Sequence, residues 1–489
     1  METNSGSRPA YRSLWIWLLL GWVAAYVDRT ITGPVVSYMI DKNLAFVGEA
    51  ANPYALGGLI GSMFFAGYIL TQFPGGYLGD RFGHRTIIVI SIFWAGIATL
   101  LSGLMTGLIV FVAFRVITGL GEGTFYSNDR TVITQQTPFE NRGLGRGVAI
   151  AGLPIGLTIA LIATVPMIGL GDSVLGTGNG WRMPFFLSGA LTLIIGFGIT
   201  RFFRGQRGEH EFRPAFLPAL RGLGKYSVVF LAVVMAIFLA ADWVSLPEWG
   251  VAVLITLAAL ALVGFTFGRR GRELGPVLYD RDLILIYISA IAILWNLWFF
   301  GFWSVSIVSQ AAGQGSLLHA GLTAAFNTGA GILGFPAGGW LGDYAKRRGW
   351  GRKWLLVAFS LFAGLSTVVF GLYLINGGSS LFVMGILLFI QATFFFALQP
   401  ISQALTADLV NNPALLGAAF GMWNLVGEIG AVLSPAISGV LRGETGDWNT
   451  AVMLDAGILL ASAVILVFVR ESRAASAEEP AEVVEQKKG

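Results

Sequence analysis

Several ionisable side chains lie inside long apolar segments of this chain of 489 residues. They are Asp28, Arg29, Arg115, Glu122, Asp129, Arg130 and Glu428. In a segment that crosses a membrane, such a group is costly unless it is paired or hydrated, so it faces the bundle interior and marks a path for ions or substrates. Their presence predicts a buried site that binds ions or charged substrates. Asp129 and Arg130 lie nearer one end of their segment, and we expect them to be gate or structural residues.

Arg29 is the candidate for binding an anion. A guanidinium group stays charged in a cavity and can hold a carboxylate through two parallel hydrogen bonds. The alternative is a structural ion pair with Asp28 or with another acid. Asp28 and Arg29 are adjacent, so they stand about 100° apart around a helix and need not point the same way.

Arg115 and Glu122 are the candidates for proton coupling. They are almost two helical turns apart and therefore share one helix face. Carboxyl groups inside transporters relay protons, so we predict that Glu122 carries the proton, while Arg115 holds Glu122 ionised in one state. Asp28 is the second candidate for the proton. The alternative is a static salt bridge between helices.

Glu428 follows Asn424 by one helical turn and lies on the same face. It is expected to extend the polar site, bind a second proton or contact a cationic group, and the alternative is a pair with an arginine. Neutral polar and aromatic residues are predicted to contact the substrate, although most membrane aromatics only pack or lie at the interface. These predicted substrate-binding residues are Tyr26, Asn296, Gln399, Asn424 and Trp303.

The apolar segments themselves predict an all-α polytopic membrane protein. Only 12% of the residues are charged and the mean hydropathy is +0.72, whereas a soluble chain carries about 25% charged residues. The apolar runs have the length of a helix that crosses the hydrocarbon core, roughly 20 residues. We predict fourteen transmembrane helices, at 14–39, 56–78, 86–105, 108–136, 144–170, 183–203, 226–243, 249–268, 283–309, 320–341, 354–374, 380–407, 413–440 and 449–470.

The basic residues predict the orientation in the membrane. With both termini in the cytoplasm, only Lys42, Arg182 and Arg442 fall in outer loops, as expected where positive charge stays inside. The pI near 9.3 is then a sign of topology, and no nucleic-acid partner is expected. We predict an integral protein of a bacterial or archaeal cytoplasmic membrane that works as a monomer in the lipid bilayer.

The centre of the chain is predicted to hold an inserted hairpin of two helices. The segments 201–225 and 269–281 are both basic, so an even number of crossings separates them. The two apolar runs between them are broken at 242–248, where no basic residue occurs. The alternative is helices that lie on the membrane surface, but neither run has the cationic face of such a helix.

A short repeat divides the chain into two halves. Gly76-Tyr77-Leu78-Gly79-Asp80 and Gly339-Trp340-Leu341-Gly342-Asp343 each end a glycine-rich span and lead into a basic loop. The expected organisation is a cytoplasmic tail at 1–13, a six-helix bundle at 14–205, a linker with the hairpin at 206–282, a second six-helix bundle at 283–470 and a disordered cytoplasmic tail at 471–489.

The first copy of the repeat resembles the signature loop of the major facilitator superfamily. Its matching residues are Gly76, Gly79, Asp80, Arg81, Gly83 and Arg85. The second copy keeps Gly339 and Asp343 but has Tyr344 in place of the arginine. The resemblance implies two six-helix bundles around a central cavity that work by alternating access. It also implies that Asp80 caps a helix of the other half and holds the outward-open state, with a lesser role for Asp343.

Other motifs resemble the anion:cation symporters of that superfamily, which carry sugar acids and related organic anions. Tyr26-Val27-Asp28-Arg29 is similar to their Tyr-x-Asp-Arg, and Gly180-Trp181-Arg182 to their Gly-Trp-Arg. The set Arg115, Glu122, Pro138, Arg142 and Gly143, and the set Gly421, Asn424, Gly427, Pro435 and Gly439, follow their patterns in two further helices. The resemblance implies symport of a small organic anion with a proton as the coupling ion. The acid at Glu428, the small Thr137 and the hairpin depart from the pattern.

Two other functions are weighed against symport. A proton-driven exporter of drugs or cations is favoured by fourteen helices, but Gly152-Leu153-Pro154-Ile155-Gly156 matches the exporters' Gly-Pro-x-x-Gly-Gly poorly. A membrane-embedded enzyme would need a nucleophile with its base, a metal cluster or a phosphate loop. The chain has no cysteine and three scattered histidines, so neither a metal site nor another cofactor is expected.

Overall fold

The described part of the chain is built from helices. The computed structural model describes residues 10–138, 141–205, 215–268, 271–313, 317–412 and 415–471, and these contain no strand. The helices are α1 (Ala10–Asp41), α2 (Ala45–Gly48), α3 (Pro53–Phe82), α4 (His84–Ser102), α5 (Leu108–Glu122), α6 (Phe125–Gln136), α7 (Arg142–Ile150), α8 (Gly152–Leu175), the 3₁₀ turn η2 (Gly180–Arg182), α9 (Met183–Gly205), α10 (Phe216–Trp243), α11 (Glu248–Gly268), α12 (Gly271–Leu278), α13 (Arg281–Ala311), α14 (Leu317–Gly329), α15 (Gly331–Arg347), α16 (Lys353–Ile375), α17 (Leu381–Leu409), α18 (Leu416–Thr445) and α19 (Asn449–Val467).

The prediction of an all-α polytopic fold is confirmed. Within the described residues, twelve helical stretches are long and apolar enough to cross a membrane. The predicted spans 249–268 and 320–341 are not among them, because the first is represented by a shorter apolar stretch of α11 and the second is divided between α14 and α15. Fourteen spans, and the role of α10 and α11 as an insertion, therefore stay predictions.

Three predicted spans are interrupted in the structure. The span 108–136 breaks between α5 and α6, 144–170 breaks at Ala151, and 320–341 breaks at Ala330. At the first break, a Cβ on Gly123 would overlap the Tyr68 carbonyl oxygen of α3. Glycine thus permits the close approach of α3 at the point where α5 ends.

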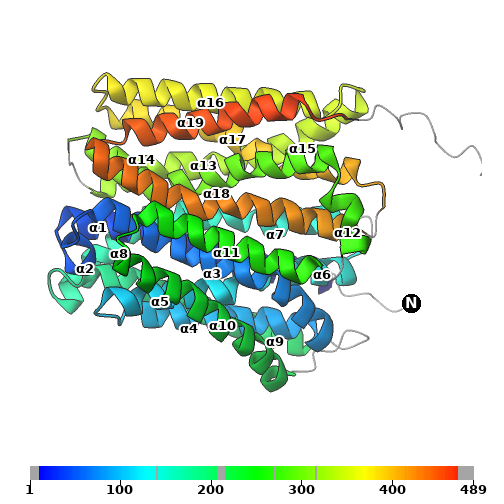
Figure 1. The fold of residues 1–489 in the computed structure, drawn as a ribbon, viewed down its shortest axis with the longest axis horizontal. Coiled ribbons are helices and arrows are strands. Elements are labelled where there is room, and N and C mark those ends of the chain that lie inside the picture. The colour runs from blue at the N-terminus through cyan, green and yellow to red at the C-terminus, as the bar shows by residue number, and fades with distance from the viewer. Residues whose placement is uncertain are drawn as a thin grey trace, which may run out of the picture.

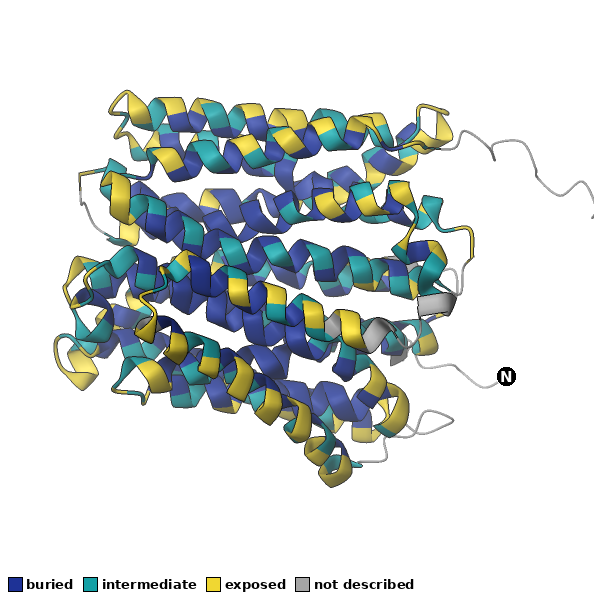
Figure 2. Cartoon of the chain, in the orientation of Figure 1, coloured by how far each residue is buried: buried dark blue, intermediate teal, exposed yellow. Residues whose placement is uncertain are grey.

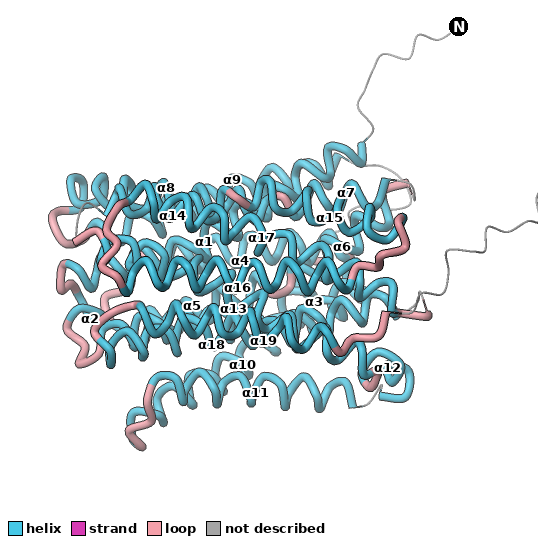
Figure 3. Tube along the Cα trace, turned by 90° about the horizontal axis from the view of Figure 1, so that it is seen from above, coloured by secondary structure: helices cyan, strands magenta, loops and turns pink. Residues whose placement is uncertain are grey.

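The helices form two groups that follow the order of the chain. Figure 1 shows α1 to α9 on one side of the bundle and α13 to α19 on the other. Buried residues concentrate along the middle of the bundle, whereas α10, α11 and α16 carry many exposed ones (Figure 2). Seen from above, α10 and α11 form a separate row at the edge (Figure 3), where α11 packs against both α3 and α18. The hairpin thus contacts both groups.

The two groups meet closely at the end that holds α2, which we call the outer end because the basic residues predict that it faces outward. A Cβ on Gly58 would overlap the Pro435 carbonyl oxygen, and one on Gly439 would overlap the Tyr54 carbonyl oxygen. The Trp303 indole donates a hydrogen bond to the Pro435 carbonyl oxygen at 3.0 Å. Backbones can approach this closely only where no side chain intervenes, so these glycines allow the outer end to close.

Candidate functional site

The charged residues of α1 and α5 form one buried cluster. Arg29 Nε lies 2.6 Å from Glu122 Oε2, and Arg115 Nη1 lies 3.5 Å from Asp28 Oδ1. The Glu122 carboxyl group also lies close enough to that of Asp28 for the two acids to interact. This pairing differs from the expected contact of Glu122 with Arg115. Arg115 and Glu122 share a face of α5, but they lie almost two helical turns apart along that helix. Each therefore reaches a different residue of α1.

Aromatic rings enclose the Arg29 guanidinium group. Its central carbon lies 4.3 Å from the Tyr68 ring centre and 4.8 Å from the Tyr26 ring centre, and the rings of Trp22 and Phe64 lie within 6 Å. Such rings attract a cation through their electron-rich faces. Among the described residues, Arg29 Nη2 has no hydrogen-bond partner. The guanidinium group is therefore held in place with one donor nitrogen left for an anion.

Arg115 is anchored through one of its guanidinium nitrogens, whereas its Nε and Nη1 have no hydrogen-bond partner among the described residues. Its Nη2 donates hydrogen bonds to the hydroxyl groups of Ser102 and Thr118, at 2.9 and 3.1 Å, and its guanidinium carbon lies 5.0 Å from the Phe185 ring centre. Its side chain is completely buried. These contacts suit a residue that positions Asp28 and balances its charge.

Close packing of α3 against α5 brings Glu122 to α1. A Cβ on Gly67 would overlap the Val116 carbonyl oxygen, and one on Gly119 would overlap the Phe64 carbonyl oxygen. Helix α3 also packs against α1, and α5 meets α1 through the Arg29–Glu122 and Arg115–Asp28 pairs. Because glycine lets these backbones touch, the acid at the end of α5 and the rings of α3 reach the same arginine of α1.

A second set of polar side chains connects the two halves of the bundle by a hydrogen bond. Asn424 Nδ2 donates to Gln72 Oε1 of α3 at 3.1 Å and to Glu428 Oε1 at 3.4 Å. Glu428 is buried and lies within electrostatic range of Arg29. The predicted pair of Asn424 and Glu428 thus faces the Arg29 site from α18. Gln72 escaped the sequence analysis because a neutral amide in a span gives a weak signal.

Asn296, a predicted substrate ligand, is engaged elsewhere. Its Nδ2 donates to Asp455 Oδ2 of α19 at 2.5 Å, and its Oδ1 accepts from Gln391 Nε2 at 3.2 Å. Asp455, Gln391 and Asn327 were missed by the sequence analysis, although an acid inside an apolar segment is the signal that identified Asp28 and Glu122. The structure therefore places Asn296 within a polar network of the second half.

The other predicted residues lie at several places in the bundle. Tyr26 stacks between the Trp22 and Trp298 rings beside Arg29, with ring centres 5.5 and 6.1 Å apart. Trp303 belongs to the outer contact, where its indole nitrogen is occupied by Pro435. Gln399 is half-buried on α17. Of the predicted substrate ligands, the structure brings Tyr26 and Asn424 to the Arg29 site.

Asp129 and Arg130 form part of the attachment of α6 to α1. The Trp22 indole donates to Asp129 Oδ2 at 2.7 Å, and Arg130 Nε lies 3.6 Å from Asp129 Oδ1. Because Trp22 also contacts Arg29, this attachment supports the site from its inner side. The contacts fit the structural one of the two roles expected for these residues, and a role as a gate stays a prediction.

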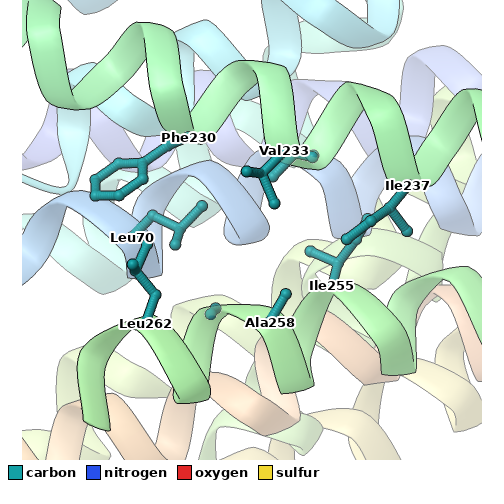
Figure 4. Close-up of a pocket in the computed structure, with 9 residues that line it drawn as sticks. Leu70, Phe230, Val233, Ile237, Ile255, Ala258 and Leu262 are labelled. Carbon is teal, nitrogen blue, oxygen red and sulfur yellow. The ribbon is translucent and has the colours of Figure 1, made fainter. Parts of the chain in front are cut away.

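The pocket between α10 and α11 has a different character. It is lined by Leu70, Phe230, Val233, Val234, Ile237, Ile255, Ala258, Ala259 and Leu262 (Figure 4). No polar side chain is available there to replace the hydration of an anion. The charged cluster at Arg29, rather than this pocket, is therefore the candidate functional site.

Sequence comparison identifies the family to which this arrangement belongs. The model of the Major Facilitator Superfamily matches residues 18–320 and 286–488. This chain belongs to the major facilitator superfamily. A relative named "Probable sulfoacetate transporter SauU" from Cupriavidus necator is 24% identical over 469 residues, which cover 92% of both chains. The D-galactonate transporter of Escherichia coli O6:H1 is 24% identical over 472 residues, which cover 94% of this chain and 96% of the relative.

A solved structure shows the same superfamily fold. A POT family transporter in complex with 5-aminolevulinic acid has a TM-score of 0.70 at 14% identity, over 94% of this chain and 96% of that one. At this identity the likeness shows the fold alone. Because the family, the named relatives and the matching structure are all transporters, the prediction of a transporter rather than an enzyme is confirmed.

The superfamily signature loop joins α3 to α4 at the inner end. Gly83 has a φ of +93°, a conformation that suits glycine, between the two helices. A Cβ on Gly79 would overlap Asn128 Oδ1 of α6, and this amide oxygen lies 2.7 Å from His84 Nδ1. Gly76 is partly buried and Arg85 is buried against the Phe203 ring, whereas Arg81 is exposed.

Among the described residues, Asp80 contacts its own half, and its expected contact with the other half stays a prediction. Its side chain is 77% exposed, and its Oδ1 lies 3.3 Å from Nε2 of His84 in its own half. In the second copy of the loop, Asp343 lies 2.6 Å from Arg352, which also pairs with Asp408. Asp343 thus takes part in an ion-pair cluster within its half, and its lesser role in the conformational cycle stays a prediction.

Proposed function

We propose that this protein is a secondary transporter that carries a small organic anion, such as a sugar acid or another carboxylate, together with a proton. The observation that carries the proposal is the buried Arg29–Glu122 pair, in which Arg29 Nη2 has no hydrogen-bond partner among the described residues. A substrate carboxylate can accept from this nitrogen. The printed names of the relatives, a sulfoacetate and a D-galactonate transporter, support an anionic substrate.

Charge balance provides a reason for the proton to accompany the anion. Asp28 and Glu122, when ionised, balance the positive charges of Arg29 and Arg115. A bound monoanion adds a negative charge inside the membrane, which costs several kcal/mol if nothing compensates it. Protonation of Glu122 removes this charge and releases Arg29 Nε for the substrate. Departure of the substrate reverses both changes and returns the proton.

The aromatic enclosure would select the substrate by size and shape. Tyr26 and Tyr68 lie on the Arg29 guanidinium group, so a carboxylate must approach along its edge, where the N–H groups point. Glu428 faces the same arginine from the opposite half. We propose that Glu428 approaches Arg29 when the site is empty and takes up a proton or moves aside when the anion enters.

Alternating access would expose this site to each side of the membrane in turn. The outer end is closed at Gly58 and Gly439, so outward opening requires the backbones of α3 and α18 to separate there. Asp80 is exposed at the inner end and would reach the other half when the inner end closes. We also propose a monomer in the cytoplasmic membrane with both termini inside, as the basic residues predict.

Uptake into liposomes that contain the purified protein tests this function. The panel holds labelled sulfonates, sugar acids and aromatic acids, each offered with and without a pH gradient that is acidic outside. We expect one class of anion to accumulate only with the gradient, and Arg29→Ala to abolish this accumulation. Gradient-driven movement of a lipophilic cation, without movement of an anion, would favour the alternative function of a proton-driven exporter. Anion uptake that is the same with and without the pH gradient would rule out proton coupling.

A further inference from the structure

An acid in the second half remains outside the proposed anion site. Asp455 lies in the apolar helix α19 and its side chain is completely buried. Its Oδ2 accepts a hydrogen bond from Asn296, whereas Oδ1 has no partner among the described residues. Asp28, Arg29, Arg115 and Glu122 belong to the other half, so they cannot balance its charge.

No titratable side chain described on the helices that contact α19 faces Asp455. These helices are α13, α16 and α18, and their titratable groups have other contacts or are exposed. Arg281 pairs with Asp282, Tyr287 donates to Val277, Lys353 lies over Trp354, Tyr373 binds Ser380, Glu428 binds Asn424, Arg442 binds Tyr54 and Glu444 is exposed. An ionised carboxylate would therefore be buried with one hydrogen bond and no counter-charge, which is costly.

A chain of amide groups ends at this carboxyl group. Asn327 Nδ2 donates to Gln391 Oε1 at 3.0 Å, Gln391 Nε2 donates to Asn296 Oδ1 at 3.2 Å, and Asn296 Nδ2 donates to Asp455. The chain joins α14, α17, α13 and α19. Each amide donates toward Asp455, so the direction of the whole chain depends on that one acceptor.

The far end of the chain lies beside a contact between the two halves. Thr328 follows Asn327 directly, and its hydroxyl group lies 2.9 Å from that of Thr158 on α8. Two residues further on, α14 breaks at Ala330. A change at Asp455 can therefore reach a cross-half contact through the hydrogen-bonded amides and the backbone link from Asn327 to Thr328.

We propose that Asp455 is a second proton-binding site, separate from the Arg29–Glu122 pair, that holds a proton while the outer end is closed. Proton binding makes the buried carboxyl group neutral and leaves Oδ2 as the acceptor for Asn296. In the other state, water reaches α19 and the proton leaves. The ionised carboxylate then accepts a stronger hydrogen bond from Asn296, which changes the hydrogen bonds along the amide chain and thereby the Thr158–Thr328 contact. The site adds one proton to each transport cycle.

Infrared difference spectroscopy of the purified full-length protein tests proton binding without any substrate. A protonated carboxyl group has a higher C=O stretching frequency than an ionised one. We expect a protonated-carboxyl band at neutral pH that Asp455→Asn abolishes. The control Glu444→Gln, which removes an exposed acid of α18, should keep it. Identical spectra for the wild type and Asp455→Asn would overturn the proposal, as would loss of the band when Na⁺ is added at constant pH, which would indicate a cation site.

A second variant tests the assignment of the band even if Asp455→Asn does not fold. Asn296→Ala removes the hydrogen bond to Oδ2, together with the acceptor of Gln391, and keeps the acid. We expect the band to remain and to shift in frequency, because the strength of that bond sets the C=O stretch. A band with unchanged frequency would show that it arises from another acid, and the assignment to Asp455 would be wrong.

The role in transport rests on the proposed function and needs its own measurement. The number of protons per substrate is obtained from the pH gradient that just halts substrate flux in liposomes. This number should fall by one in Asp455→Asn, and an unchanged number would overturn the proposed role. If the wild type itself shows no gradient-driven flux, the proposed symport fails, while the infrared result still decides whether Asp455 binds a proton.

Discussion

Arg29 Nε donates a hydrogen bond to Glu122 Oε2 at 2.6 Å and joins α1 to α5 inside the bundle. The two side chains are only 2% and 4% exposed. A substrate anion that binds Arg29 must therefore compete with Glu122 or share the guanidinium group with it. A substitution of either residue should therefore change substrate binding.

Arg29→Lys should weaken substrate binding severely although it keeps the charge. An ammonium group is a compact point charge, whereas the planar guanidinium group can serve Glu122 and a substrate at once. Loss of a hydrogen bond to a charged group costs about 1.5–3 kcal/mol, so we expect at least a tenfold weaker affinity. Substrate-dependent thermal stabilisation of the purified protein measures this. Arg130→Lys, in a pair that we assign to structure, is the control, and unchanged transport by Arg29→Lys and Arg29→Ala would exclude Arg29 as a ligand.

Glu122→Gln should separate exchange from accumulation. The amide mimics a permanently protonated acid, so no proton can be released inside and uptake should no longer follow the pH gradient. Exchange of substrate across the membrane needs no net proton movement and should survive. Counterflow and gradient-driven uptake in liposomes, both corrected for the amount of protein, measure the two activities.

A purely structural Arg29–Glu122 pair predicts a different result for the same variant. Arg29 would remain buried without its partner, at a cost of about 3–5 kcal/mol, and expression, exchange and uptake would fail together. Accumulation at the wild-type level would eliminate Glu122 as the proton carrier, and Asp28→Asn and Glu428→Gln would then be tested in the same way.

Gly439→Ala should shift the protein toward the state with an open outer end. The added Cβ would overlap the Tyr54 carbonyl oxygen in the closed contact, so α3 and α18 cannot approach as closely. Spin labels on cysteines at Glu49 and Glu444, both exposed at the outer end, report the separation, and we expect a longer distance. Gly421→Ala on the same helix meets no atom within 4 Å and should leave the distance unchanged. Equal distances in both variants would show that this contact does not limit closure.

Cysteine labelling should locate the loop between α10 and α11 outside. The chain has no natural cysteine, so single cysteines can be placed at Ser245 and at Arg347, which are both exposed. In intact cells, an impermeant thiol reagent should react with the first and not with the second. Labelling of both, or of Arg347→Cys alone, would contradict the predicted orientation.

The helices and the candidate charges could be predicted from the sequence for simple physical reasons. A helix needs about 20 apolar residues to cross the hydrocarbon core, so the spans are visible as runs, and a charge within a run is costly enough to indicate function. This reasoning found Asp28, Arg29 and Glu122. It would equally have indicated Asp455, which was overlooked although the signal is present.

The partners of these residues were decided only by the tertiary structure. The spacing of Arg115 and Glu122 showed that they share a face of α5, but the rotation and depth of α1 against α5 determine that Glu122 meets Arg29 and Arg115 meets Asp28. The position of α5 depends on close backbone contacts with α3 at Gly67 and Gly119, and a sequence analysed one helix at a time does not reveal such contacts. The same holds for Asn296, whose amide was expected at the substrate and instead binds Asp455, since only the packing of α13 against α19 brings the two together.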